Sequence, residues 1–79
     1  MIVRLLFFGA TASVVGTRRL STAVNDRAAA AHVIEQLRHE YPELRNHKLL
    51  FAVNEEYVVA DTRLNEGDEL AIFTAVSGG

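Results

Sequence analysis

The start of the chain is almost entirely apolar, and the two-residue repeat of a strand would place apolar side chains on both of its faces. Residues 1–8 carry one charged side chain, at Arg4. Successive side chains of a strand point to opposite sides. One face is then formed by Val3, Leu5 and Phe7, and the other by Arg4, Leu6 and Phe8. Such a strand needs a partner surface on both sides.

A turn and a second strand follow. Residues 9–16 are small and turn-permissive, and residues 18–24 have the composition of a strand, so we expect the first two strands to form a hairpin. The two glycines of this turn lack the Gly-Lys-Ser/Thr ending of a phosphate-binding loop, and we do not expect nucleotide binding here.

The apolar spacing then changes to that of a helix over residues 27–40. Asn25-Asp26 is the candidate N-cap, and Pro42 disfavours helical geometry at the residue before it, so the helix should end near Glu40. The stripe that faces the core consists of Ala30, Val33, Ile34, Leu37 and Tyr41.

Three more strands are predicted after the helix. Residues 42–47 form a polar connection, residues 48–53 a third strand and residues 57–59 a short edge strand. A strong turn signal at residues 65–68 precedes the last strand, residues 69–74.

This order of elements fits an α+β roll, in which one main helix crosses one face of a mixed sheet of about five strands. With the last strand beside the first, the fold is a β-grasp. At 79 residues we expect one domain over residues 1–75 and a flexible C-terminal tail over residues 76–79, ending in Gly-Gly. With one helix available, Leu6, Phe8 and Phe73 should form an apolar patch on the uncovered face. Exposed apolar patches commonly mark protein interfaces.

Composition excludes several classes of function. A net charge of -2 gives no electrostatic reason to expect nucleic acid or an anionic membrane as a partner. The absence of cysteine excludes thiolate metal sites and a cysteine nucleophile. We see no signal peptide and no apolar run long enough for a membrane span, so we expect a soluble cytoplasmic protein.

The side chains offer no convincing catalytic constellation. His32 and His39 lie near one helix face, but no third ligand is evident and a solvated face is the better interpretation. The adjacent carboxylates, Glu55-Glu56 and Asp68-Glu69, lie in predicted turns, where they are ordinarily solvated. No serine lies in a nucleophile motif. We expect a protein that is not itself an enzyme and binds no metal.

The end of the chain carries a family resemblance. Residues 65–71 (Asn-Glu-Gly-Asp-Glu-Leu-Ala), then Phe73, then residues 76–79 (Val-Ser-Gly-Gly), resemble the ending of the MoaD family. These proteins are the small, ubiquitin-like sulfur-carrier subunits of molybdopterin synthase. Residues 6–9 and 51–54 and Tyr57-Val58 resemble the same family, so the match runs nearly end to end.

The resemblance implies a carrier cycle for molybdenum cofactor biosynthesis. An E1-like (MoeB-like) activating enzyme uses MgATP to adenylate the carboxylate of Gly79. A sulfur donor, such as a cysteine desulfurase or a rhodanese-type protein, then converts it to a thiocarboxylate. The tail, Val76, Ser77 and Gly78, enters the large (MoaE-like) subunit of molybdopterin synthase, where sulfur passes to precursor Z. No cofactor is bound by the carrier itself.

The resemblance also implies a docking surface formed by Phe8, Tyr57 and Phe73, and a heterotetramer of two small and two large subunits. The chain departs from the family at Thr74-Ala75, where a proline pair is common. Three alternatives stay open: a β-grasp sulfur carrier for thiamin, tRNA thiolation or cysteine synthesis; a ubiquitin-like modifier joined through Gly79; and a docking domain without catalytic function.

Overall fold

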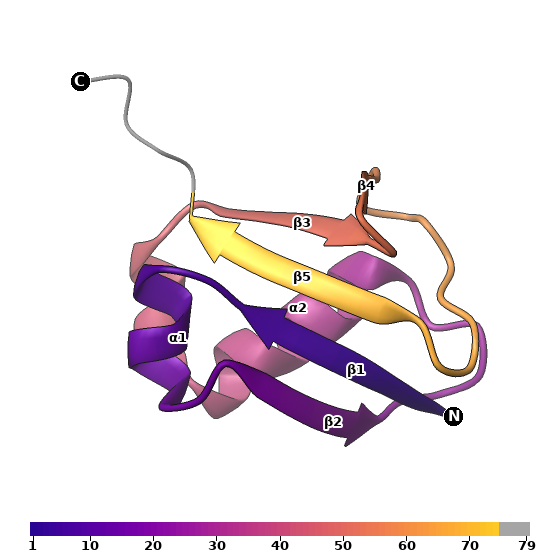
Figure 1. The fold of residues 1–79 in the computed structure, drawn as a ribbon, viewed down its shortest axis with the longest axis horizontal. Coiled ribbons are helices and arrows are strands. Elements are labelled where there is room, and N and C mark those ends of the chain that lie inside the picture. Colours follow the sequence, from indigo (N-terminus) through magenta and orange to yellow (C-terminus); the bar gives the residue numbers. More distant parts are fainter. Residues whose placement is uncertain (75–79) are drawn as a thin grey trace.

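A computed structural model describes residues 1–74 as a mixed sheet with helices packed against it (Figure 1). The strands are β1 (Ile2–Phe7), β2 (Arg19–Ala23), β3 (Leu49–Val53), β4 (Glu56–Tyr57) and β5 (Glu69–Thr74). The helices are α1 (Ala10–Val15), α2 (Ala30–Glu40) and the 3₁₀ helix η1 (Pro42–Asn46). The predicted α+β class, with five strands and one main helix, is confirmed.

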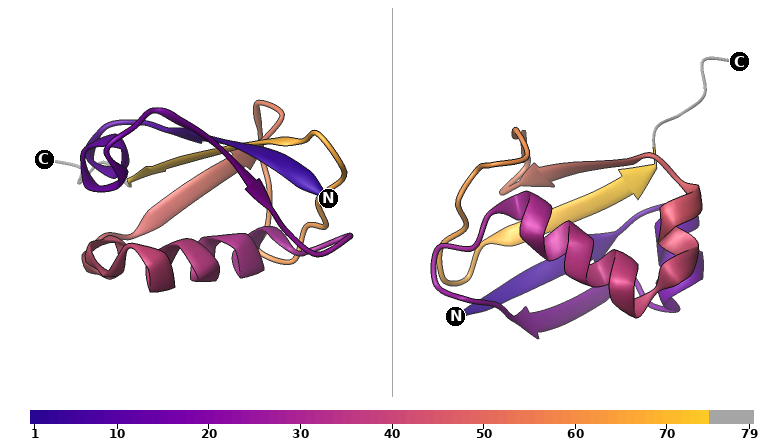
Figure 2. Two further views of the ribbon diagram at one scale, coloured as in Figure 1. Left: turned by 90° about the horizontal axis from the view of Figure 1, so that it is seen from below. Right: turned by 180° about the vertical axis from the view of Figure 1, so that it is seen from behind.

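The last strand lies at the centre of the sheet, in the order β2-β1-β5-β3-β4. β5 is parallel to β1 and antiparallel to β3, while β2 and β4 form the two edges. Figure 2 shows α2 crossing one face of the sheet, with α1 at one end. The opposite face, which we call the open face, carries none of the helices of residues 1–74.

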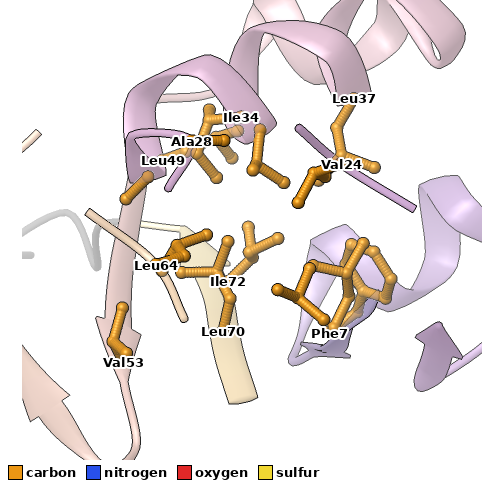
Figure 3. Packing of buried hydrophobic residues seen from close by; sticks show 14 of the residues in the cluster. Phe7, Val24, Ala28, Ile34, Leu37, Leu49, Val53, Leu64, Leu70 and Ile72 are labelled. Carbon is orange, nitrogen blue, oxygen red and sulfur yellow. The ribbon is translucent and has the colours of Figure 1, made fainter. Parts of the chain in front are cut away.

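The core lies between α2 and the sheet (Figure 3). Alternation predicted the buried face of β1 correctly, because Val3, Leu5 and Phe7 are at most 1% exposed. The same holds for β5, where Leu70 and Ile72 are fully buried. From α2 the core receives Ala30, Val33, Ile34 and Leu37, which are four of the five predicted stripe positions.

The prediction of a simple turn at residues 9–16 was wrong. β1 and β2 do pair antiparallel, but α1 connects them. The helix ends at Gly16, whose φ of 89° is left-handed and whose N–H donates to the carbonyl of Ala12 at 2.8 Å. The segment is rich in β-branched residues, which are modest helix formers, so its helical state depends on tertiary contacts. The buried Thr11 is one of them.

The predicted start of the long helix was also wrong. Arg27 has a φ of 59°, and α2 begins at Ala30 without a side-chain cap from Asn25 or Asp26. The preceding residues pair with a distant segment instead. The carbonyl of Ala28 accepts a hydrogen bond from the N–H of Leu64 at 2.9 Å. That pairing holds the chain extended until Ala30.

The second half of the chain differs from prediction mainly in its boundaries. β5 has the predicted bounds, and β4 is an edge strand that begins one residue earlier than expected and is shorter. β2 and β3 each start one residue later than expected, and β2 also ends one residue earlier. Residues 42–47 are not a plain polar connection, because η1 forms there and buries Leu44 completely.

Candidate functional site

Apolar side chains gather on the open face, toward the end of the sheet where β1 and β5 finish. We call this group the open-face patch. It consists of Leu6, Phe8, Leu50, Tyr57 and Phe73. Phe8, Tyr57 and Leu50 are exposed, Tyr57 most of all at 79%, and Leu6 and Phe73 are half-buried. A contiguous apolar surface of this kind on a small domain is typical of a protein-binding site.

Strand register brings the members of the patch together. Phe73 of β5 pairs with Leu50 of β3, and Leu6 of β1 pairs with Ala71 of β5. Phe8 directly follows β1, and its N–H donates to the carbonyl of Ile72 at 3.0 Å. The parallel register therefore continues to Phe8 and places it on the strand next to Phe73.

Tyr57 and Phe73 touch across β3. Their ring centroids are 5.8 Å apart and the rings meet edge to face, at 68°, an arrangement that aromatic pairs prefer. Between them, Ala52 of β3 pairs with Tyr57 and is 8% exposed although its side chain points to the open face. Its small side chain leaves room for Tyr57 to lie over the sheet.

A tight turn sets the position of Tyr57. Asn54 and Glu55 connect β3 to β4 with φ of 49° and 70°, and positive φ at both central residues is typical of a two-residue hairpin turn. The amide of Asn54 fixes this turn to β5. Its Nδ2 donates to Asp68 at 3.0 Å, and its Oδ1 accepts from the N–H of Glu69 at 3.0 Å.

The structure places all three predicted docking residues, Phe8, Tyr57 and Phe73, on this patch. Alternation alone grouped Phe8 with Phe73, whereas Tyr57 was named only through the family resemblance. Leu50 was missed. The strand that contains it is apolar at every position, so its sequence shows no alternation that would assign Leu50 to the open face.

The predicted carrier residues, Val76, Ser77, Gly78 and Gly79, lie outside the described residues. β5 ends at Thr74, two positions before Val76, and Phe73 is the residue before Thr74. The patch and the predicted site of chemistry are therefore neighbours along the chain.

Other clusters do not form a second site. Residues 1–74 contain no group of three or more His, Asp or Glu side chains arranged to hold a metal ion. Asp68 has a structural role in the turn before β5, where its carboxylate accepts from the N–H of Asn65 at 2.7 Å. Within the same residues, no helix is long and apolar enough to cross a bilayer.

Comparison with known proteins decides the family. A model of the ThiS family matches residues 5–79. The chain belongs to the ThiS family. It is 34% identical to the molybdopterin synthase sulfur carrier subunit of Mycobacterium tuberculosis, over 98% of this chain and 96% of that protein. The subunit of the same name from Escherichia coli K12 is 35% identical, over 98% of this chain and 99% of its own length.

Solved structures agree with the observed fold. SAMP1 from Haloferax volcanii superposes with a TM-score of 0.84 at 26% identity, over the full length of both chains. A chain from the complex of subunits 1 and 2 of the molybdopterin-converting factor of Helicobacter pylori matches over the full length of both chains, with a TM-score of 0.69 at 22% identity. The β-grasp prediction and the resemblance to MoaD proteins are both confirmed.

Proposed function

We propose that this protein is the sulfur carrier subunit of a molybdopterin synthase and that its Gly79 carboxylate carries the sulfur. The observation that carries the proposal is the similarity to proteins of that name over nearly the whole chain, together with a family match that extends to residue 79. The alternatives of a thiamin, tRNA-thiolation or cysteine-synthesis carrier, a protein modifier and a plain docking domain are not favoured by these relatives.

The chemistry assigned to Gly79 needs no side chain of this protein. A carboxylate is a poor acyl donor until it has a good leaving group. An activating enzyme with MgATP would supply one, because attack of a carboxylate oxygen on the α-phosphorus releases pyrophosphate and leaves an acyl adenylate. Hydrosulfide then displaces AMP and gives the thiocarboxylate directly; a persulfide donor displaces AMP to give an acyl disulfide, which a thiol must cleave to reach the same product. The carrier is thus a substrate of its activating enzyme and not a catalyst.

The open-face patch gives the carrier a means of docking. We assign to it the large subunit of the synthase, which would hold the active site and receive residues 76–79. The complex of two subunits from Helicobacter pylori supports a partner of this kind. Because Phe73 lies on β5 just before the tail, docking of this face brings Gly79 close to the partner that uses it.

Intact mass spectrometry tests the proposal. After incubation of the full chain with its activating enzyme, MgATP and a sulfur donor, we expect the mass to rise by the difference between sulfur and oxygen. A variant without Gly79 ends in Gly78 and is the matched control, which should stay unmodified because the acceptor is one residue short. An unchanged mass of the wild-type chain, with an enzyme that modifies a known carrier, would refute the proposal.

A further inference from the structure

One row of side chains crosses the whole open face. The register of the strands aligns Arg19 of β2 with Leu6 of β1, and Leu6 with Ala71 of β5. Ala71 is aligned in turn with Ala52 of β3, and Ala52 with Tyr57 of β4. The row therefore begins with a cation at the β2 edge and ends with an aromatic ring at the β4 edge.

A groove extends the open-face patch to the β2 edge. It encloses ≈ 400 Å³ and is lined by Leu6, Phe7, Phe8, Gly9, Arg18 and Arg19. Two of these residues, Leu6 and Phe8, belong to the patch. A surface that covers the patch on this side also meets Arg19, which the register with Leu6 places on the open face, while Arg18 precedes it at the rim of the same groove.

The positive charges of Arg18 and Arg19 are not balanced by ion pairs within the described residues. Both side chains are exposed, and no carboxylate of residues 1–74 forms an ion pair with either of them. Their backbone is nevertheless well fixed, because the carbonyl of Arg18 accepts a hydrogen bond from the N–H of Phe7 at 2.9 Å. Two unpaired cations thus stand at a defined place beside an apolar surface.

The opposite edge of the sheet has the opposite charge. Glu55 and Glu56 are exposed beside Tyr57 at the β4 edge and form none of the ion pairs found in residues 1–74. A partner with carboxylates on one side of its apolar surface gains from meeting Arg18 and Arg19. If the same partner were rotated by half a turn about the normal to the sheet, its carboxylates would lie at the β4 edge, near Glu55 in the turn before β4. Like charges in that position disfavour the reversed orientation.

We propose that the partner that covers the open face presents carboxylates to Arg18 and Arg19 at the β2 edge, next to the apolar surface that covers Leu6 and Phe8. This inference rests on the proposed function, because the partner is taken to be the large subunit of the synthase. The ion pairs at the rim fix the direction of β5 on that subunit. They also raise the rate of association, as charges at the rim of an interface do.

Binding of the large subunit to charge-reversed variants tests the inference. We expect Arg19→Glu to weaken the affinity by about tenfold at an ionic strength of roughly 0.05 M, mostly through the association rate, and the loss to shrink at roughly 0.5 M as salt screens the contact. Arg18→Glu together with Arg19→Glu should have a larger effect, and Arg19→Lys should retain most of the affinity because the charge remains.

Arg45→Glu is the matched control, since it changes the net charge by the same amount on η1, in the helical layer. Arg45 pairs with Glu35 at 3.1 Å and lies outside the open-face patch. We expect its affinity to stay within about twofold of wild type, because exposed ion pairs contribute little to stability and this one does not meet the partner. Thermal unfolding of every variant verifies that the fold is intact.

Two results would overturn the inference and leave the proposed function standing. One is an unchanged affinity of Arg19→Glu at both salt concentrations while Phe73→Asp weakens binding. The other is an equal loss in Arg19→Glu and Arg45→Glu, which would indicate a general effect of net charge. If the wild-type chain does not bind the large subunit at all, the proposed function fails, and the inference fails with it.

Discussion

Thr11 is the residue that joins α1 to the ends of both central strands. Its side chain is fully buried, and its Oγ1 lies 2.7 Å from the carbonyl oxygen of Phe8 and 3.0 Å from that of Ile72. The same oxygen accepts from the N–H of Phe8 at 3.1 Å. One hydroxyl thus organises the backbone beside both Phe8 and Phe73 of the open-face patch.

Replacement of Thr11 by Val tests this role at the scale of one residue. The shape is nearly kept, but the site loses the single O–H donor shared by the two carbonyls and an acceptor for the N–H of Phe8, so we expect the free energy of unfolding to fall by about 1–3 kcal/mol in urea titrations. Ser13→Ala, an exposed position of the same helix, should change it by less than about 0.5 kcal/mol. Equal stability of Thr11→Val and wild type would show that the hydroxyl is dispensable.

At the scale of the element, β5 serves two surfaces through alternate residues. Leu70 and Ile72 are fully buried against the core, whereas Ala71 and Phe73 face the open side. A central strand of a two-layer domain with one helix layer must have one such uncovered face. The strand therefore combines fold stability and the proposed partner binding without sharing residues between them.

Two alanine substitutions on neighbouring residues separate these tasks. Ile72→Ala leaves a cavity in the core and should cost about 2–5 kcal/mol of unfolding free energy, measured by urea or thermal denaturation. Phe73→Ala should cost about 1 kcal/mol or less, because its side chain is only partly buried and contacts Tyr57. If both variants lost the same stability, the open face would have to be part of the core.

The sequence predicted the elements whose signals are local. The two-residue period in residues 1–8 and 69–74 was sufficient, because Arg4 marks the open face of the first strand and Glu69 and Ala71 mark that of the last. The helical state of residues 10–15 was not predictable, because contacts of Thr11 with distant backbone stabilise it. The late start of α2 has a similar cause, since residues 27–29 pair with a segment more than thirty positions away, at Arg63 and Leu64.

The residues of the candidate site also differ in whether the sequence alone could predict their positions. Phe8 and Phe73 could be grouped by alternation, whereas Gly79 was named through the family resemblance and stays a prediction. Tyr57 could not, because its place depends on the positive φ of Asn54 and Glu55, which bends a short edge strand over Ala52. Neither residue is glycine, so the turn carried no strong signal.

At the scale of the whole molecule, one layer of helices on one face leaves the other face for association. A domain of this length buries only about 60% of the surface of its unfolded chain, so an uncovered apolar face is a substantial part of its exterior. The open-face patch should therefore control binding to the large subunit while contributing little to the stability of the isolated domain.

The variant Phe73→Asp tests whether the open-face patch is needed for binding and not for the stability of the domain. We expect the affinity for the large subunit to fall by at least about tenfold, because a charge would be buried at the centre of the interface. The thermal unfolding temperature of the isolated domain should stay near that of wild type. An affinity equal to wild type would place the interface elsewhere on the molecule.

The central position of β5 also affects the order in which the domain can form during synthesis. β1 and β3 have no contact through the sheet until β5 is inserted between them, and β5 is the last strand of residues 1–74 to be synthesised. A chain that stops before Glu69 has two unconnected strand pairs with open edges, and such fragments are prone to unfolding and degradation. A folded domain therefore includes β5 and Thr74, the residue that leads into the proposed carrier tail.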